Sequence, residues 1–237
     1  MQRYCLILIL FLSIYSCNSE IKPVEFDMIS VDETFDAEIS ASYNVAKGNS
    51  ELATTINLTI EEAIVSLLSD PGVTTDLKSA LNDFNEEYKS FKAEFPESSE
   101  PVWELSIETE RTYQSEDIIT LAISVYEFQG GAHGNDKIIF LNLNAETGSI
   151  LKMKDIINDL EGFKSLAENH FKKSLNSNTD EPKIEDYFFG EPYQLPENIG
   201  FSEDGLVMLY NTYEIASYDK GYTEYVIPID EVEPFLK

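Results

Sequence analysis

Histidine and cysteine are scarce in this 237-residue chain, which contains two of each. Both cysteines, Cys5 and Cys17, lie within the first 17 residues. A protein zinc site takes three or four ligands from histidine, cysteine and carboxylates, often in patterns such as His-Glu-x-x-His, and the chain has no such pattern. The sequence therefore predicts no metal site and no cofactor.

Motifs for nucleophilic and phosphate chemistry are also missing. The chain has no Gly-x-Ser-x-Gly elbow for a hydrolase nucleophile and no glycine-rich loop of the phosphate-binding types. His170 lies on a predicted helix stripe beside Phe171, where a satisfied, half-buried histidine is expected. The sequence thus predicts no catalytic residue. One alternative stays open, an envelope-glycan hydrolase that uses His133 with a nearby carboxylate as acid and base.

Basic residues are few, because 16 Lys and Arg face 44 Asp and Glu, which gives a net charge of −28. The negative electrostatic field of such a protein repels nucleic-acid phosphates and attracts cationic molecules. A strong negative charge also serves solubility alone. The composition therefore predicts no nucleic-acid partner and leaves two interpretations, a basic ligand or a solubility device.

The first residues are typical of an export signal. Arg3 precedes a nearly continuous apolar run over residues 5–15, which is shorter than the roughly 20 residues of a membrane span. Residues 13–17, Ser-Ile-Tyr-Ser-Cys, resemble the lipobox of bacterial lipoproteins. We expect a signal peptide at 1–16, a lipid on Cys17 that anchors the protein to a membrane, and a tether at 17–30. This places the protein in the cell envelope, on the periplasmic or outer-membrane side. An ordinary secretory peptide is the alternative.

Hydrophobic periodicity predicts an α+β fold, an antiparallel sheet with a helical hairpin and a further helix packed on it. Apolar and polar residues alternate over residues 35–44, as in a strand with one buried face. Apolar stripes with helical spacing follow over 52–68 and 77–95, and Asn49 or Ser50 can cap the first of them. Asp70-Pro71-Gly72 and Pro96 are expected to end these two helices.

One domain is predicted over residues 31–237, with halves at about 31–128 and 129–237. A third helix is expected over 160–175, and a loop-rich insert over 176–200. Further strands are expected over residues 103–110, 118–128, 137–144, 149–151, 205–216 and 222–229.

A glycine-dense segment lies between two of the predicted strands, and its members are Gly130, Gly131, Ala132, His133, Gly134 and Asn135. Glycine permits backbone angles that other residues resist, so the segment is expected to form a sharp strand-to-strand turn. The side chains of His133 and Asn135 can bond nearby backbone groups. We predict a structural turn here, which can also form part of a binding surface.

Tyrosines gather near the end of the chain, at Tyr210, Tyr213, Tyr218 and Tyr222. Because tyrosine joins a large apolar body to a polar tip, such a cluster suits an interface or a sugar-stacking surface. These four residues are our candidate aromatic surface. The alternative is that they alternate along an amphipathic strand at the edge of the core.

Several motifs in order resemble one known family. Residues 125–129, Val-Tyr-Glu-Phe-Gln, run into the glycine segment, and residues 142–148, Asn-Leu-Asn-Ala-Glu-Thr-Gly, follow as a hairpin. Residues 213–218, Tyr-Glu-Ile-Ala-Ser-Tyr, then precede Gly221 and Ile227-Pro228. This order resembles the extracytoplasmic domain of unknown function shared by the anti-sigma factor RsiV and the peptidoglycan deacetylase PdaC.

The resemblance implies a binding or sensing role. In RsiV-like proteins the domain binds lysozyme, a basic protein, and in PdaC-like proteins it precedes a separate catalytic domain. We therefore expect a lipid-anchored envelope protein whose non-enzymatic domain binds a lysozyme-like protein or a cell-wall component such as peptidoglycan. The alternative is a peptidoglycan-modifying hydrolase or an accessory to one.

Overall fold

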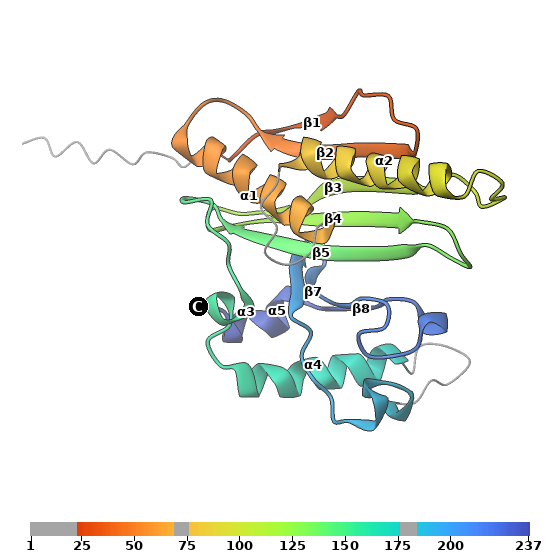
Figure 1. Ribbon diagram of the computed structural model, residues 1–237. Coiled ribbons are helices and arrows are strands. Elements are labelled where there is room, and N and C mark those ends of the chain that lie inside the picture. Colours follow the sequence, from red (N-terminus) through yellow and green to blue (C-terminus); the bar gives the residue numbers. More distant parts are fainter. Residues whose placement is uncertain (1–22, 69–75, 176–183) are drawn as a thin grey trace, which may run out of the picture.

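The computed structural model describes residues 23–68, 76–175 and 184–237. The predicted signal peptide, Cys17 and the Asp70-Pro71-Gly72 helix stop lie outside these residues. Two sheets and the helices around them form the described chain (Figure 1). The mixture of helices and mainly antiparallel strands confirms the α+β prediction. Within the described residues, no helix is both long enough and apolar enough to span a membrane.

The first sheet has five strands in the order β1-β2-β3-β4-β5. All neighbours pair antiparallel except β2 and β3, which run parallel, so the expectation of a purely antiparallel sheet is wrong at this pair. Parallel neighbours need a long crossover connection, and the two helices between β2 and β3 supply it. The strands are β1 (Phe26–Ser30), β2 (Glu38–Ala46), β3 (Glu104–Gln114), β4 (Ile118–Phe128) and β5 (Asn135–Asn144).

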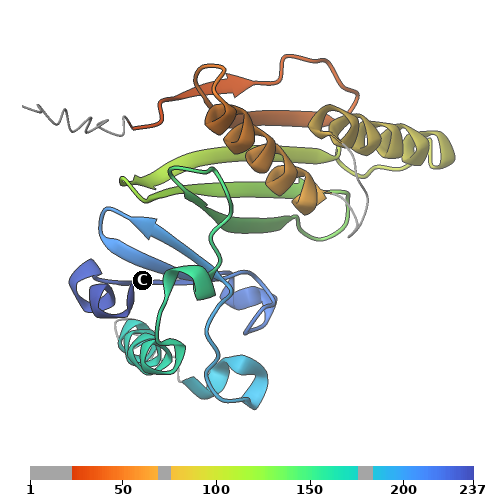
Figure 2. The same cartoon turned by 90° about the vertical axis from the view of Figure 1, so that its left-hand side faces the viewer.

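The two crossover helices, α1 (Glu51–Leu68) and α2 (Leu77–Glu94), confirm the predicted helix pair. The hydroxyl oxygen of Ser50 accepts a hydrogen bond from the Ala53 amide at 3.1 Å and caps α1. Ile56, Ile60 and Ile64 on α1 are fully buried against the sheet. Figure 2 shows both helices on one face of the sheet. The apolar stripes therefore bury the face that their spacing predicted.

The second sheet, in the order β6-β7-β8, corrects the prediction of a single sheet. β6 lies in the stretch that was predicted to be a loop-rich insert. β7 ends at residue 210, six positions before the predicted end, because residues 211–214 form a turn closed by the Glu214 amide on the Asn211 carbonyl at 3.0 Å. The helix α4 agrees with the prediction. The elements of this part are α3 (Met153–Ile156), α4 (Leu160–Leu175), η1 (Ile184–Asp186), η2 (Phe188–Gly190), β6 (Asn198–Ser202), β7 (Gly205–Tyr210), η3 (Tyr218–Lys220), β8 (Thr223–Ile227), α5 (Ile229–Val232) and η4 (Glu233–Phe235).

Each sheet has its own hydrophobic core. The first core contains α1, α2 and buried residues as far as Ala145, and the second begins at Ile156. Phe171 on α4 stands at the centre of the second core, where five aromatic rings lie around it. Because β5 pairs with β4 along its whole length, the chain passes from one core to the other after residue 145, beyond the expected division at 128/129.

Asparagine side chains join the two sheets along the outer edge of β5. Asn198 accepts from the Phe140 amide at 2.7 Å and donates to the Ile138 carbonyl at 2.7 Å. Asn211 accepts from the Ile138 amide at 2.8 Å and donates to the same carbonyl at 2.8 Å. Asn142 donates in the other direction, to a backbone carbonyl of β6 at 2.7 Å. This asparagine seam (Asn142, Asn198 and Asn211) satisfies backbone groups that an edge strand otherwise leaves unpaired.

Candidate functional site

The glycine segment and the tyrosine cluster meet in the folded chain. The imidazole of His133 stacks on the ring of Tyr218, with 3.8 Å between ring centroids and 20° between planes. The Tyr218 hydroxyl donates to the Gly134 carbonyl at 3.3 Å. The ring of Tyr213 lies 5.5 Å from that of Tyr218. Two motifs that are more than 80 positions apart thus build one surface. We call it, together with Tyr126, the aromatic platform (Tyr126, His133, Tyr213 and Tyr218).

The three glycines of the segment serve this surface in two ways. Gly130 and Gly131 have φ angles of 90° and 92°, which turn the chain sharply at the end of β4. A carboxylate oxygen of Glu100 accepts the Gly131 amide at 3.2 Å and holds the turn. At Gly134 a Cβ atom would lie 2.4 Å from the ring of Tyr126, so only glycine allows this approach. The structure agrees with the predicted strand-to-strand turn, and Asn135 begins the next strand.

His133 lies at the surface of the platform. Its Nδ1 is 3.0 Å from the Gly134 carbonyl, and this contact requires that Nδ1 carry the proton. Over residues 23–68, 76–175 and 184–237, no carboxylate or hydroxyl is hydrogen-bonded to the imidazole. The same residues hold no group of three or more metal-binding side chains. The contacts that the imidazole does make are its stack on Tyr218 and its bond to the Gly134 carbonyl.

The exposed tyrosines differ from their predicted setting. Tyr213 and Tyr218 are 57% and 37% exposed, and Tyr222 is also exposed. They lie beyond the end of β7 rather than along it. Tyr213 adopts a φ of 70°, unusual for a residue with a side chain and frequent at functional sites. Among the described residues, Tyr222 makes no ring contact with the platform.

Tyr210 does not belong to the aromatic surface. It is only 1% exposed, and its hydroxyl donates to the Gln194 carbonyl at 2.5 Å inside the second core. Burial raises its pKa far above the ordinary range of tyrosine. The physical reason is that β7 ends at residue 210, so this tyrosine still occupies an inward strand position while the later ones leave the strand.

Tyr126 is the platform residue that the sequence reasoning missed. It lies on β4 opposite Asp136 of β5, and its pKa is raised by desolvation and by the nearby carboxylates of Glu104 and Asp136. The available signal was its place two residues before the end of a strand that runs into the glycine segment. The carboxylates of Glu104 and Asp136 thus lie close to an aromatic ring of the platform. This arrangement favours a cationic ligand.

His170 behaves as a structural residue. Its Nε2 lies 3.0 Å from a carboxylate oxygen of Glu231, which joins α4 to α5. The imidazole lowers the pKa of the Glu231 carboxyl. The side chain is mostly buried and has a partner, as its place on the helix stripe predicted.

Two family models match successive parts of the chain. The model of the deacetylase PdaC matches residues 31–136, and the model of a protein family of unknown function, DUF3298, matches residues 150–230. The two matched ranges follow one another along the chain, with residues 137–149 between them. Both matches agree with the family resemblance that the sequence motifs carry.

Solved structures of DUF3298 proteins have a similar fold. A DUF3298 family member from Bacteroides fragilis superimposes with a TM-score of 0.69 at 22% sequence identity, over 91% of this chain and 96% of that one. A DUF3298 family protein from Pseudomonas aeruginosa gives a TM-score of 0.66 at 19% identity, over 92% of this chain and 96% of the other. Among curated proteins, none matches this chain.

The aromatic platform draws residues from both of the matched parts of the chain. Tyr126 and His133 belong to the residues that the PdaC model matches, and Tyr213 and Tyr218 belong to those that the DUF3298 model matches. The ring stack between His133 and Tyr218 is therefore a contact between the two parts. A surface of this kind exists only when both parts are folded and docked.

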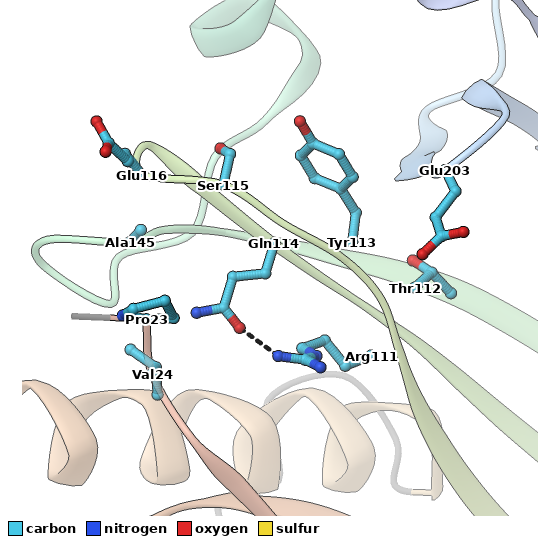
Figure 3. Close-up of a pocket in the computed structure, with 10 residues that line it drawn as sticks. All are labelled: Pro23, Val24, Arg111, Thr112, Tyr113, Gln114, Ser115, Glu116, Ala145 and Glu203. Carbon is cyan, nitrogen blue, oxygen red and sulfur yellow. Dashed lines mark hydrogen bonds between the residues drawn. The ribbon is translucent and has the colours of Figure 1, made fainter. Parts of the chain in front are cut away.

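A further cavity lies at the other end of β3 (Figure 3). Its volume is about 760 Å³, and Pro23 and Val24 border it. Arg111 and Gln114 point into it together, joined by a hydrogen bond of 2.5 Å. Glu116 and Glu203 also line the cavity. Arg111, Glu116 and Glu203 are the charged residues of this cavity, and their side chains do not form a convergent set of polar groups. We therefore assign no ligand to it.

Proposed function

We propose that this chain is a lipid-anchored, non-enzymatic binding domain of the cell envelope, whose ligand is a basic protein of the lysozyme type. The observation that carries the proposal is the aromatic platform, where exposed rings lie beside carboxylates. A Lys or Arg side chain gains from both, through the face of a tyrosine and through the nearby negative charge. Peptidoglycan is the second ligand to test, because sugars also stack on tyrosine rings.

The charge of the chain supports a basic partner. A net charge of −28 attracts a cationic protein over a distance of about 10 Å at ordinary salt and speeds the encounter. Electrostatic complementarity of this kind sets specificity and association rate more than final affinity. The platform then supplies the short-range contacts that hold the partner.

The place of the platform suits a tethered receptor. In Figure 1, the start of β1 lies at the left end of the five-stranded sheet, and the turn between β4 and β5 lies at the right end. That turn carries the glycine segment and His133. A lipid on Cys17 would hold the left end near a membrane and leave the platform facing away from it.

The test is retention of lysozyme, and separately of peptidoglycan, by the full exported domain at low and at moderate salt. We expect lysozyme to be retained at low salt and released as salt rises. The double variant Tyr213→Ala/Tyr218→Ala should weaken retention roughly tenfold. Tyr222→Ala is the matched control, because it removes an exposed tyrosine outside the ring contacts. Retention of neither ligand would refute the proposal.

The alternative of a glycan hydrolase draws on one observation, the exposed His133 whose Nε2 is free to face a substrate. Such an enzyme would release soluble fragments from peptidoglycan. It would lose this activity when His133 is replaced by Ala, with the fold intact.

A further inference from the structure

A second hollow lies at the same end of the five-stranded sheet as the platform, on the side that the helices cover. Two adjoining cavities of about 580 and 610 Å³ follow the C-terminal half of α2 and share Phe91, Glu94 and Phe95. We call this hollow the α2 groove, and its main members are Ser90, Phe91, Glu94, Phe95, Glu100 and Trp103. The proposed function does not use these residues.

The floor of the α2 groove is aromatic. The ring of Phe91 lies 5.4 Å from that of Phe95 and 5.4 Å from that of Trp103. Phe95 is 49% exposed at the end of the helix, so part of its ring is open to a ligand. Aromatic faces of this kind attract ammonium and guanidinium groups.

The walls of the groove are acidic. Glu94, Glu97 and Glu100 surround the C-terminal end of α2, where the helix dipole is itself negative. None of these three carboxylates forms an ion pair with a Lys or Arg of the described residues. Burial raises the pKa of the Glu127 carboxyl, and the negative charge of Glu87, two turns before the end of α2, raises it further. This shift is consistent with negative charge that no nearby cation balances. The groove is thus complementary to a cation.

Within the described part of the chain, the indole of Trp103 carries an unpaired donor in the wall beside the groove. Trp103 is only 8% exposed, and its Nε1 has no hydrogen-bond partner among the described residues. Buried N–H groups without a partner are rare and costly. This nitrogen lies 3.8 Å from the position that a Cβ on Gly130 would take, and a carboxylate oxygen of Glu100 lies 3.5 Å from that position. The Nε1–H group of Trp103 therefore lies at the side of the groove that adjoins the glycine segment.

We propose that the α2 groove takes a Lys- or Arg-bearing segment of a partner protein. The cationic group lies over Phe95 between Glu94 and Glu100, next to the buried indole of Trp103. The assignment rests on the proposed function, because it extends the surface for a basic partner. The two surfaces adjoin through Glu100, whose carboxylate also holds the Gly131 amide.

Trp103 is the single tryptophan of the chain, so its fluorescence reports on the groove directly. The experiment titrates the full domain with a hexalysine peptide at low salt, follows Trp103 emission, and measures the dissociation constant by calorimetry. The test variant is Glu94→Gln/Glu100→Gln, in which the glutamine at position 100 keeps an oxygen for the Gly131 amide. The matched control is Glu161→Gln/Glu185→Gln, which removes the same charge from the second part of the chain.

We expect hexalysine to change Trp103 emission and the test variant to bind it roughly tenfold more weakly, whereas the control stays within about twofold. Phe95→Ala should also weaken binding. Equal affinity in test variant and parent, or no effect of the peptide on Trp103, overturns the groove assignment. If lysozyme is retained and only the tyrosine variant releases it, the groove assignment fails alone. If hexalysine binds the groove and no basic protein is retained, the proposed function fails alone.

Discussion

Replacing Asn211 by Asp should loosen the second sheet from the first. The amide of Asn211 accepts from the Ile138 N–H and donates to the Ile138 carbonyl, both at 2.8 Å, so it imitates a paired peptide group. An ionised aspartate keeps the acceptor and loses the donor. It also sets a negative oxygen against the Ile138 carbonyl and close to Glu214, whose pKa burial already raises.

The expected loss follows from these contacts. One donated hydrogen bond is worth about 1 kcal/mol, and a carbonyl that faces an oxygen without a proton costs about as much again. The free energy of unfolding should therefore fall by about 2 kcal/mol at pH 7. For a chain of this size, that lowers the melting temperature by roughly 4–8 °C.

The pH dependence gives the sharper test. A protonated aspartic acid again has both an acceptor and a donor, so the defect should shrink as the pH falls toward about 4. The assay is urea unfolding at pH 7 and pH 4, with hydrogen exchange of the Ile138 amide as a local probe. Asn169→Asp, an exposed change on α4, is the control. Unchanged stability at pH 7 would show that the seam does not hold the sheets together. An equal loss at both pH values would refute the explanation from the missing donor.

Three further outcomes are expected. Phe171→Ala should lower the free energy of unfolding by about 3–5 kcal/mol in urea, because five rings lose contact with it, and a loss below about 1.5 kcal/mol would contradict its central place. Because burial and Glu87 raise the pKa of Glu127, its ionised form costs stability above that pKa and the cost disappears below it. Glu127→Gln should therefore raise the melting temperature at pH 7 and leave it unchanged near pH 4. His133→Ala should cost about 1 kcal/mol through the lost stack on Tyr218, and neither parent nor variant should release soluble glycan from peptidoglycan. Release by the parent alone would favour the hydrolase.

Local signals predicted the helices because their causes are local. The stripe of α4 and the cap of α1 depend on residues three or four positions apart, and the predicted and observed ends of α4 agree. The parallel pairing of β2 with β3 depends on residues more than 60 positions apart, and no pattern within either strand specifies it. β6 escaped prediction because it is short and includes Gly200, which packs against the ring of Phe140 and depends on that distant contact.

The candidate site likewise contains one feature with a local cause, which the sequence predicted, and one with a long-range cause, which it did not. The turn at Gly130 and Gly131 follows from glycine itself, and the structure has it where the sequence placed it. The stack of His133 on Tyr218 is a contact between the two parts of the domain and has no local signal. The error at Tyr210 came from extending β7 across the turn that Asn211 begins, since the alternation of tyrosines continues past the real end of the strand.

The glycine segment joins the two surfaces of this end of the molecule. On one side, Gly134 admits the ring of Tyr126 to the aromatic platform, and on the other, the Gly131 amide holds Glu100 beside the α2 groove. Neither contact uses a reactive group of the segment. Its importance is therefore geometric, because a side chain at Gly134 displaces the platform and a changed turn at Gly131 releases a wall of the groove. A partner that contacts both surfaces would sense the conformation of this one turn.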